Sequence, residues 1–328
     1  MTGNTLGWVI VAFVLYLLMM IAIGAFYAKG NNNSEDYFLG GRKLNGFVAA
    51  LSAQASDMSG WLLMGLPGAI YLTGVGGDGW IAIGLFIGTT LNWLFIATKL
   101  RRYTIRANNS VTLPTYFENR FHDEKKVLMT VSSITIVVFF LVYCASALSA
   151  GGQLFESVFG IDYHVALTIG ALVVLVYTFL GGFTAVCVTD FIQGMLMLVG
   201  ILAVPLFAYH FLTTGGTTLS AGLEASGADS ANFLNLMKNG DGSNNIISVI
   251  SGLGWGLGYF GMPHILVRFM AVRDEKEMTK SKATAISWVA LSLGFAVFIG
   301  ILGRAYLPEL VNGNNEKVFI EMIKKVFT

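Results

Sequence analysis

The sequence predicts an all-α, polytopic membrane protein with about eight transmembrane helices. Hydrophobic residues make up 55% of the chain, charged residues only 12%, and the mean hydropathy is +0.69. Soluble domains are more polar than this, so we expect lipid to be the solvent. The apolar stretches reach the ~20 residues that a helix needs to cross the hydrocarbon core. They are apolar all round rather than alternating, which favours helices over the strands of a membrane barrel.

Polar or glycine-rich breaks separate the eight predicted spans. We expect the spans at 6–28, 46–73, 80–98, 127–149, 163–181, 190–212, 245–263 and 283–307. The first run has no positively charged start and is too long for a signal peptide, so it is expected to remain as a helix. The longest connection, around 213–244, is rich in Gly, Ser, Thr and Asn and is typical of a loop. No soluble domain is predicted.

The basic residues fall in alternate connections, which predicts the orientation in the membrane. Lys and Arg favour the cytoplasmic side. We therefore expect a multi-pass protein of the cytoplasmic (inner) membrane, with its amino terminus outside. The basic connections are short and acidic residues are mixed into them, so a nucleic-acid partner is not predicted. The basic connections after spans one, three and seven carry Lys29, Arg42 and Lys43; Lys99, Arg101, Arg102, Arg106, Arg120, Lys125 and Lys126; and Arg268, Arg273, Lys276, Lys280 and Lys282.

The cysteines and histidines do not indicate a cofactor or a metal centre. Cys144 and Cys187 lie in or beside different spans without CxxC spacing, so both are interpreted as small packing residues. The histidines are not spaced like a metal-ligand set and are interpreted as structural. They are His122, His164, His210 and His264.

The second span carries an acidic residue where the hydrocarbon core is expected. Asp57 is the only charge between Lys43 and Asp78. An Asp at the centre of a spanning helix costs ~2.5 to 3.5 kcal/mol on insertion scales, so we expect it to face a cavity or an ion. Gly and Pro residues after Asp57 weaken the helix, and irregular backbone at this depth lines cavities in secondary transporters. The alternative is a structural Asp57 that is hydrogen-bonded to a neighbouring helix.

The seventh span has the same character. Glycines recur through 252–261 and Pro263 follows, which permits close packing and makes unwinding easy. Trp255 and Tyr259 are four positions apart, so on an α-helix they share a face that suits an apolar ring with charged groups. Simple packing is the alternative for both. Interrupted spans at corresponding places in two halves indicate the binding site of a transporter, and these two are five spans apart.

Several segments resemble the sodium/solute symporter family, in particular its proline-transporting members. They are 37–42 (YFLGGR), 57–68 (DMSGWLLMGLPG), 143–146, 154–156, 181–183, 189–190 and 254–268. The resemblance implies a sodium-coupled transporter fold, an inverted repeat of five plus five helices. It implies a single transmembrane domain over 1–328, with a peripheral first helix at 1–28, the first repeat at 46–212 and the start of the second at 245–328. The implied activity is symport of L-proline with Na⁺ by alternating access, with no catalytic residues, cofactor or obligate protein partner.

The resemblance also implies roles for individual residues. Asp57 would contribute to both sodium and proline binding, and Ala55 and Met58 would offer backbone carbonyls to the ion. Arg42 and Asp190 match charged positions that influence sodium coupling; the alternatives are that Arg42 follows the charge rule and that Asp190 caps the sixth span. The other expected solute-binding residues are Gly60, Trp61, Tyr143, Trp255, Tyr259 and Pro263.

The sequence departs from the family pattern at two places. Met262 stands beside the expected pocket where the family usually has Gln. The chain also stops at Thr328, before a ninth span and the family's Ser and Thr sodium ligands, so we expect an incomplete transporter that inserts but does not transport alone. Solute range, affinity and oligomeric state are left open. So are three alternatives: a sibling symporter for pantothenate, a sugar or another osmolyte; an ion channel; and a membrane enzyme, although no catalytic pair is evident.

Overall fold

The computed structural model describes residues 3–312 and 314–327, and these residues form helices without any β-strand. The predicted all-α class is confirmed. The chain divides into two compact units, each built from three segments. Unit 1 comprises Met1–Asp57, Phe95–Gln193 and Pro263–Ser281, and unit 2 comprises Met58–Leu94, Gly194–Met262 and Lys282–Thr328.

Unit 1 contains the amino-terminal helix and the long helices that follow residue 95. Its connection after α1 holds two short helical segments, and Asn33 caps the first of them with its side chain. The elements are α1 (Gly3–Ala28), α2 (Ser34–Leu39), η1 (Gly40–Arg42), α3 (Gly46–Met58) up to Asp57, α6 (Thr98–Arg106), α7 (Leu113–Phe121), α8 (Val127–Phe159), the first part of α9 (Tyr163–Thr214), α13 (Pro263–Ala271) and the start of α14 (Glu275–Tyr306).

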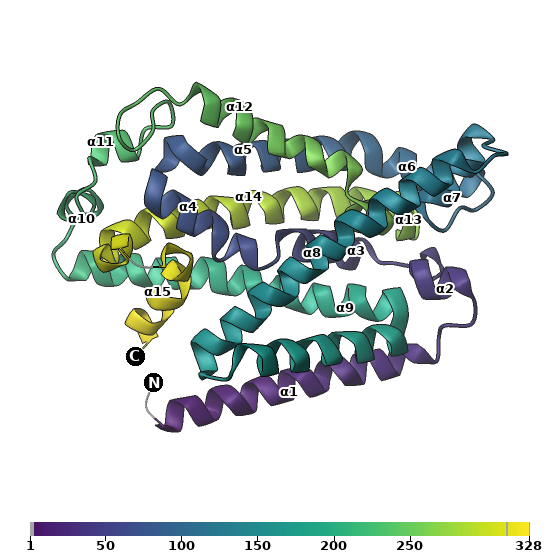
Figure 1. Ribbon diagram of the computed structural model, residues 1–328, viewed down its shortest axis with the longest axis horizontal. Coiled ribbons are helices and arrows are strands. Elements are labelled where there is room, and N and C mark those ends of the chain that lie inside the picture. Colours follow the sequence, from purple (N-terminus) through teal and green to yellow (C-terminus); the bar gives the residue numbers. More distant parts are fainter. Residues whose placement is uncertain (1–2, 313, 328) are drawn as a thin grey trace. The chain divides into compact units, whose positions relative to one another are not determined.

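Helices α1 and α9 pack closely within unit 1, where the first part of α9 lies alongside α1 (Figure 1). A Cβ on Gly24 would lie 2.9 Å from the Tyr177 carbonyl oxygen, so the glycine permits the two backbones to approach. Helix α8 makes a contrast, because no residue in its most apolar 18-residue window is buried. Its apolar side chains are therefore available to lipid.

The 52-residue helix α9 covers two of the predicted spans, 163–181 and 190–212. Gly182 interrupts it with φ 61° and ψ −159°, a conformation that disfavours any residue with a side chain. A Cβ at Gly182 would also lie 3.0 Å from the Tyr37 carbonyl oxygen. The predicted break between these two spans, polar or glycine-rich, thus lies at a single glycine, Gly182.

Unit 2 is organised around the pairing of α5 (Val75–Leu91) with α12 (Ile246–Trp255), which Figure 1 shows side by side. Gly84 and Gly88 of α5 face the backbones of Gly252 and Gly256, where a Cβ would collide with a carbonyl oxygen. The close packing predicted from the glycines of the seventh span is confirmed. The other elements are η2 (Gly60–Leu62), α4 (Gly65–Thr73), a π-helical stretch η3 (Asn92–Ala97) up to Leu94, α10 (Leu219–Ala225), α11 (Ser230–Phe233), η4 (Gly256–Gly261), η5 (Pro308–Asn312), η6 (Asn315–Lys317), α15 (Val318–Phe327) and the remainders of α9 and α14.

Five helices in the described part of the chain are long and apolar enough to cross a membrane, and the interrupted pair 246–261 and 263–271 would make a sixth. The predicted span 46–73 is divided among α3, η2 and α4. The chain is therefore a multi-pass membrane protein. The connection predicted as a loop around 213–244 contains α10 and α11, which begin where Thr218 and Asp229 accept hydrogen bonds from backbone amides.

Candidate functional site

Both predicted helix interruptions are present. Ser59, with φ 45° and ψ −158°, separates α3 from η2, and its hydroxyl accepts a hydrogen bond from the Trp61 amide. Met262 adopts an extended conformation between η4 and α13. The division into two units falls at the same places, after Asp57 and after Met262.

Unit 1 contains a buried ion pair between α9 and α13. The Arg268 Nη2 lies 2.8 Å from Asp190 Oδ2, and both side chains are almost fully buried. Ser52 and Ser56 donate to the same Asp190 oxygen at 2.7 and 3.0 Å. They also accept hydrogen bonds from Arg268, at 2.8 Å to Nε and 2.7 Å to Nη2. We call these four residues the paired cluster.

The paired cluster corrects two interpretations made from the sequence. Arg268 is not a charge of the cytoplasmic connection: it lies inside α13, where Asp190 compensates its charge and the Phe183 ring lies 5.7 Å from its guanidinium carbon. Asp190 does not cap a helix, because α9 continues through it without a break. Ser52 and Ser56 reach both charges because residues four apart on α3 share one face.

A second acid–base pair in unit 1 is not satisfied. Asp57, at the end of α3, has its Oδ1 3.9 Å from Nε2 of His264, beyond hydrogen-bonding distance. The Asp57 side chain is 6% exposed and that of His264 11%. Among the described residues, Asp57 Oδ2 and both ring nitrogens of His264 are buried without a hydrogen-bond partner. We call Asp57 and His264 the open pair.

Two aromatic residues of α8 hold the His264 ring. Tyr143 stacks on it with ring centres 5.5 Å apart, and Phe140 meets it edge-on at 5.4 Å. The Tyr143 hydroxyl donates to the Ser56 carbonyl oxygen at 2.9 Å. Pro263 precedes His264 as the first residue of α13, a position where its missing amide hydrogen is not needed. The structure thus brings together the predicted residues Asp57 and Tyr143 beside His264, while the predicted ion ligand Ala55 is buried on α3.

Unit 2 holds the other predicted solute-binding residues. The rings of Trp61 and Trp255 stack with centres 5.7 Å apart. A Cβ on Gly60 would meet only the methyl of Met64, at 3.7 Å, so the backbone there is accessible. Met58, the first residue of unit 2, is buried.

The expected common face of Trp255 and Tyr259 is not found. Trp255 is 50% exposed, whereas Tyr259 is 3% exposed. The reason is the change from α-helix to 3₁₀-helix at Gly256, which alters the angle between residues four apart. The Tyr259 carbonyl oxygen also accepts a hydrogen bond from Asn92 at 2.8 Å.

Arg42 is buried rather than exposed in a connection, which differs from the simple charge-rule interpretation. It adopts φ 54°, and its guanidinium approaches Glu35 at 3.4 Å. Burial lowers the pKa of the guanidinium, whereas Glu35 acts in the opposite direction. Its hydrogen bonds join η1 to the end of α6 and to α13, and the acceptors are the Asn109 and Thr104 side chains and the Met270 and Ser110 carbonyl oxygens.

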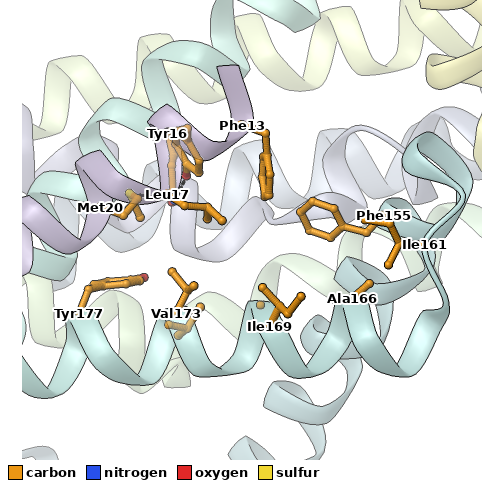
Figure 2. Close-up of a pocket in the computed structure, with 13 residues that line it drawn as sticks. Phe13, Tyr16, Leu17, Met20, Phe155, Ile161, Ala166, Ile169, Val173 and Tyr177 are labelled. Carbon is orange, nitrogen blue, oxygen red and sulfur yellow. Dashed lines mark hydrogen bonds between the residues drawn. The ribbon is translucent and has the colours of Figure 1, made fainter. Parts of the chain in front are cut away.

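Unit 1 also contains a partly open apolar pocket of about 320 Å³, lined by α1, α8 and α9. Figure 2 shows Phe13 and Leu17 of α1 directed toward Val173 and Ile169 of α9, with Phe155 at one end. Polar groups enter it from Tyr16, Tyr177 and Gln193, and the amide of Gln193 donates to the Tyr16 hydroxyl. No charged side chain is among the lining residues, so this pocket does not suit an ion or a charged solute.

Sequence reasoning missed His264 and Arg268. The sequence does place them four apart after Pro263, on one face of a short helix, which is the signal that was available. Their partners are far away in the chain, however, and no local pattern indicates that Asp57 and Asp190 meet them.

Comparison with known proteins assigns the chain to a family. The model of the "Sodium:solute symporter family" matches residues 37–328. The chain belongs to this family. The resemblance seen in the sequence motifs is confirmed.

Curated relatives named "Sodium/proline symporter" are similar over nearly the whole chain. Those of Salmonella typhimurium and Escherichia coli are 44% identical over 324 residues, and that of Haemophilus influenzae is 45% identical over 326 residues. Each alignment covers 97% of this chain and 63% of the relative. This member of the symporter family therefore spans less than two thirds of the length of these relatives.

A solved structure shares the fold. The structure of a Na⁺-coupled sialic acid symporter, in a substrate-bound outward-open state, superposes with a TM-score of 0.78 and covers 95% of this chain and 66% of the other. The two sequences are only 20% identical. The predicted transporter fold is thus confirmed at the level of architecture.

Proposed function

We propose that this protein takes part in the import of L-proline coupled to sodium, by symport with alternating access. The observation that carries the proposal is the buried Asp57 carboxylate, one of whose oxygens lacks a partner among the described residues. The chain belongs to a family of sodium:solute symporters, and the names of its relatives specify proline. Buried polar groups are normally satisfied, so an exception of this kind supports a bound ligand.

The chemistry of Asp57 suits a cation. An unpaired carboxylate oxygen accepts a hydrogen bond from an ammonium group or ligates a hard cation such as Na⁺, by extension of the oxygen preference of other hard ions. Carbonyl groups of Ala55 and Met58 would add oxygen ligands where α3 ends, since the last carbonyls of a helix lack intrahelical partners.

The remaining predicted residues keep their proposed roles. We assign solute contact to Gly60, Trp61, Tyr143, Trp255, Tyr259 and Pro263, as the family resemblance implies. Asp190 and Arg42 influence sodium coupling rather than contact solute, because both already have protein partners. The accessible backbone at Gly60 and the half-exposed ring of Trp255 support contact with a solute.

The topology follows from the distribution of charge. We assign the amino terminus to the outside of the cytoplasmic membrane, and the basic segments around α6 and the start of α14 to the inside. Arg102 and Glu275 form an exposed ion pair there, at 2.6 Å. The repeats are assigned to 46–212 and 245–328, with α1 as the peripheral helix.

Counter-transport in proteoliposomes tests the function. The full-length gene product is reconstituted into liposomes, loaded with unlabelled proline and supplied with radiolabelled proline in sodium or potassium buffer. The proposal predicts saturable accumulation of label that requires sodium. Accumulation that is equal in potassium, or better competition by pantothenate, a sugar or another osmolyte than by proline, would contradict it. A channel or an enzyme would give no exchange.

A further inference from the structure

We infer that His264 is a solute-recognition residue that donates a hydrogen bond to the carboxylate of the transported amino acid, next to Asp57. The inference rests on the proposed function, because it assigns one end of the same solute. The ring lies 3.9 Å from Asp57, and neither of its nitrogens has a partner among the described residues.

The missing partners require an explanation. A buried donor or acceptor without a hydrogen bond destabilises a fold, and native proteins contain few of them. His264 and Asp57 do not satisfy one another, because 3.9 Å exceeds the N–H···O range of about 2.7–3.2 Å. Three buried polar atoms in one place, namely the two ring nitrogens and the Asp57 Oδ2, therefore favour a ligand that brings both donors and acceptors.

An amino-acid zwitterion has this combination of groups. Its ammonium is a cationic donor that matches Asp57, and its carboxylate is an acceptor that matches an imidazole N–H. A neutral imidazole always carries one N–H, so the role requires no change of protonation. The position of His264 in the first turn of α13 also favours a negative group, since the amino-terminal end of a helix carries partial positive charge.

The nearby cation is not available for the same role. Arg268, one turn further along α13, donates from Nε to Ser52, from Nη1 to the His264 carbonyl oxygen, and from Nη2 to Asp190 and Ser56. Its three nitrogens are thus all engaged. Among the described residues of unit 1, His264 is a buried donor without a partner, 3.9 Å from Asp57.

The geometry of the ring favours recognition over simple packing. Tyr143 and Phe140 hold the imidazole from two directions, which fixes the direction of its N–H bonds. A phenylalanine would fill the same space between these rings without leaving two nitrogens unsatisfied. We therefore assign solute recognition to the ring nitrogens of His264 rather than to the shape of the ring.

Substrate analogues combined with variants test this inference. Uptake of radiolabelled proline is measured in cells expressing the gene, with unlabelled proline or L-prolinamide as competitor. Prolinamide keeps the ammonium and replaces the carboxylate by a neutral amide. In the wild-type protein, proline should compete about 10- to 100-fold better than prolinamide, the range expected for one hydrogen bond to a charged group.

The His264→Phe variant should lose most of this preference, because competition by proline should weaken while competition by prolinamide should change little. His264→Gln retains a donor and should keep much of it. The exposed His210 provides the control, since His210→Phe should leave the ratio unchanged. The inference about His264 would be overturned if His264→Phe left the proline-to-prolinamide ratio unchanged. It would also be overturned if His264→Gln lost the preference for proline as completely as His264→Phe. Neither result would affect the proposed function. Absence of sodium-dependent proline uptake by the wild type would overturn the proposed function as well.

Discussion

Unit 1 contains two acid–base pairs that use the same helices in opposite ways. In the paired cluster, α13 provides Arg268, α9 provides Asp190, and two serines of α3 complete the hydrogen bonds. In the open pair, α13 provides His264 and α3 provides Asp57, and three polar atoms lack partners among the described residues. A single turn of α13 separates the two, and the carbonyl oxygen of His264 accepts a hydrogen bond from Arg268.

The comparison indicates that the paired cluster stabilises the fold, whereas the open pair is available to bind a ligand. Disrupting a buried ion pair that has all its hydrogen bonds destabilises the fold, because either partner alone would be an uncompensated charge. An unsatisfied pair contributes little to the fold, so its removal should change binding and leave stability nearly intact. The paired cluster also fixes α3 and α13 where they present the open pair.

The largest effect on stability should come from breaking the ion pair. Arg268→Met leaves Asp190 buried without a counter-charge and should lower the free energy of unfolding by about 3–5 kcal/mol. The double variant Arg268→Met, Asp190→Leu removes both charges and should recover most of this loss. Thermal unfolding of the purified protein in detergent measures both variants. Equal losses in the single and double variants would show that the two charges do not depend on one another.

Removing one serine of the paired cluster should have a smaller effect. Ser52→Ala deletes a fully buried hydroxyl that donates to Asp190 and accepts from Arg268, which should cost about 1.5–3 kcal/mol of unfolding free energy. The matched control is Ser287→Ala on the exposed side of α14, where no loss is expected. Equal stability of the two variants in the same unfolding assay would contradict the role of Ser52.

The hydroxyl of Tyr143 lies between the two pairs, since it donates to the backbone of Ser56 while its ring stacks on His264. Tyr143→Phe keeps the stacking and deletes one neutral hydrogen bond, so we expect a loss of about 0.5–1.5 kcal/mol. Chemical denaturation monitored by tryptophan fluorescence checks the value. A loss as large as that of Arg268→Met would place Tyr143 in the paired cluster instead.

The smallest change is expected in the open pair itself. His264→Phe removes two unsatisfied nitrogens and preserves the aromatic contacts with Phe140 and Tyr143, so the unfolding free energy should stay within about 1 kcal/mol of the wild type. The melting temperature in detergent gives the test. A drop comparable to that of Ser52→Ala would mean that the ring nitrogens already have partners that stabilise the fold.

The sequence predicts those features that depend on local composition. Long apolar runs predict the helices, and the concentration of Gly, Ser and Pro after Asp57 and before Pro263 predicts the two interruptions. The break predicted between 163–181 and 190–212 lies at Gly182, and helical structure resumes directly after it. The expected common face of Trp255 and Tyr259 is wrong because the seventh span changes from α-helix to 3₁₀-helix at Gly256, where its backbone lies against α5.

The two pairs show why the site was only partly predictable. A single charge in an apolar span identifies Asp57 from the sequence, because the cost of burying it is a local property. Arg268 lies at the end of an apolar run, where the charge rule assigns it to a connection. Its partner Asp190 is 78 residues away. Only the fold brings α9 and α13 together, so the pairing cannot be read from either segment.

The most direct test of this account is Asp57→Asn. The substitution keeps the shape of the side chain, and no hydrogen bond to Oδ2 is lost among the described residues, so insertion and melting temperature should remain near wild type. Sodium-stimulated uptake of radiolabelled proline should be abolished, because the only charge of the second span is gone. Both quantities are measured on the same membranes, with Asp190→Asn as the destabilised comparison. Uptake that retains the wild-type dependence on sodium in Asp57→Asn would contradict the account.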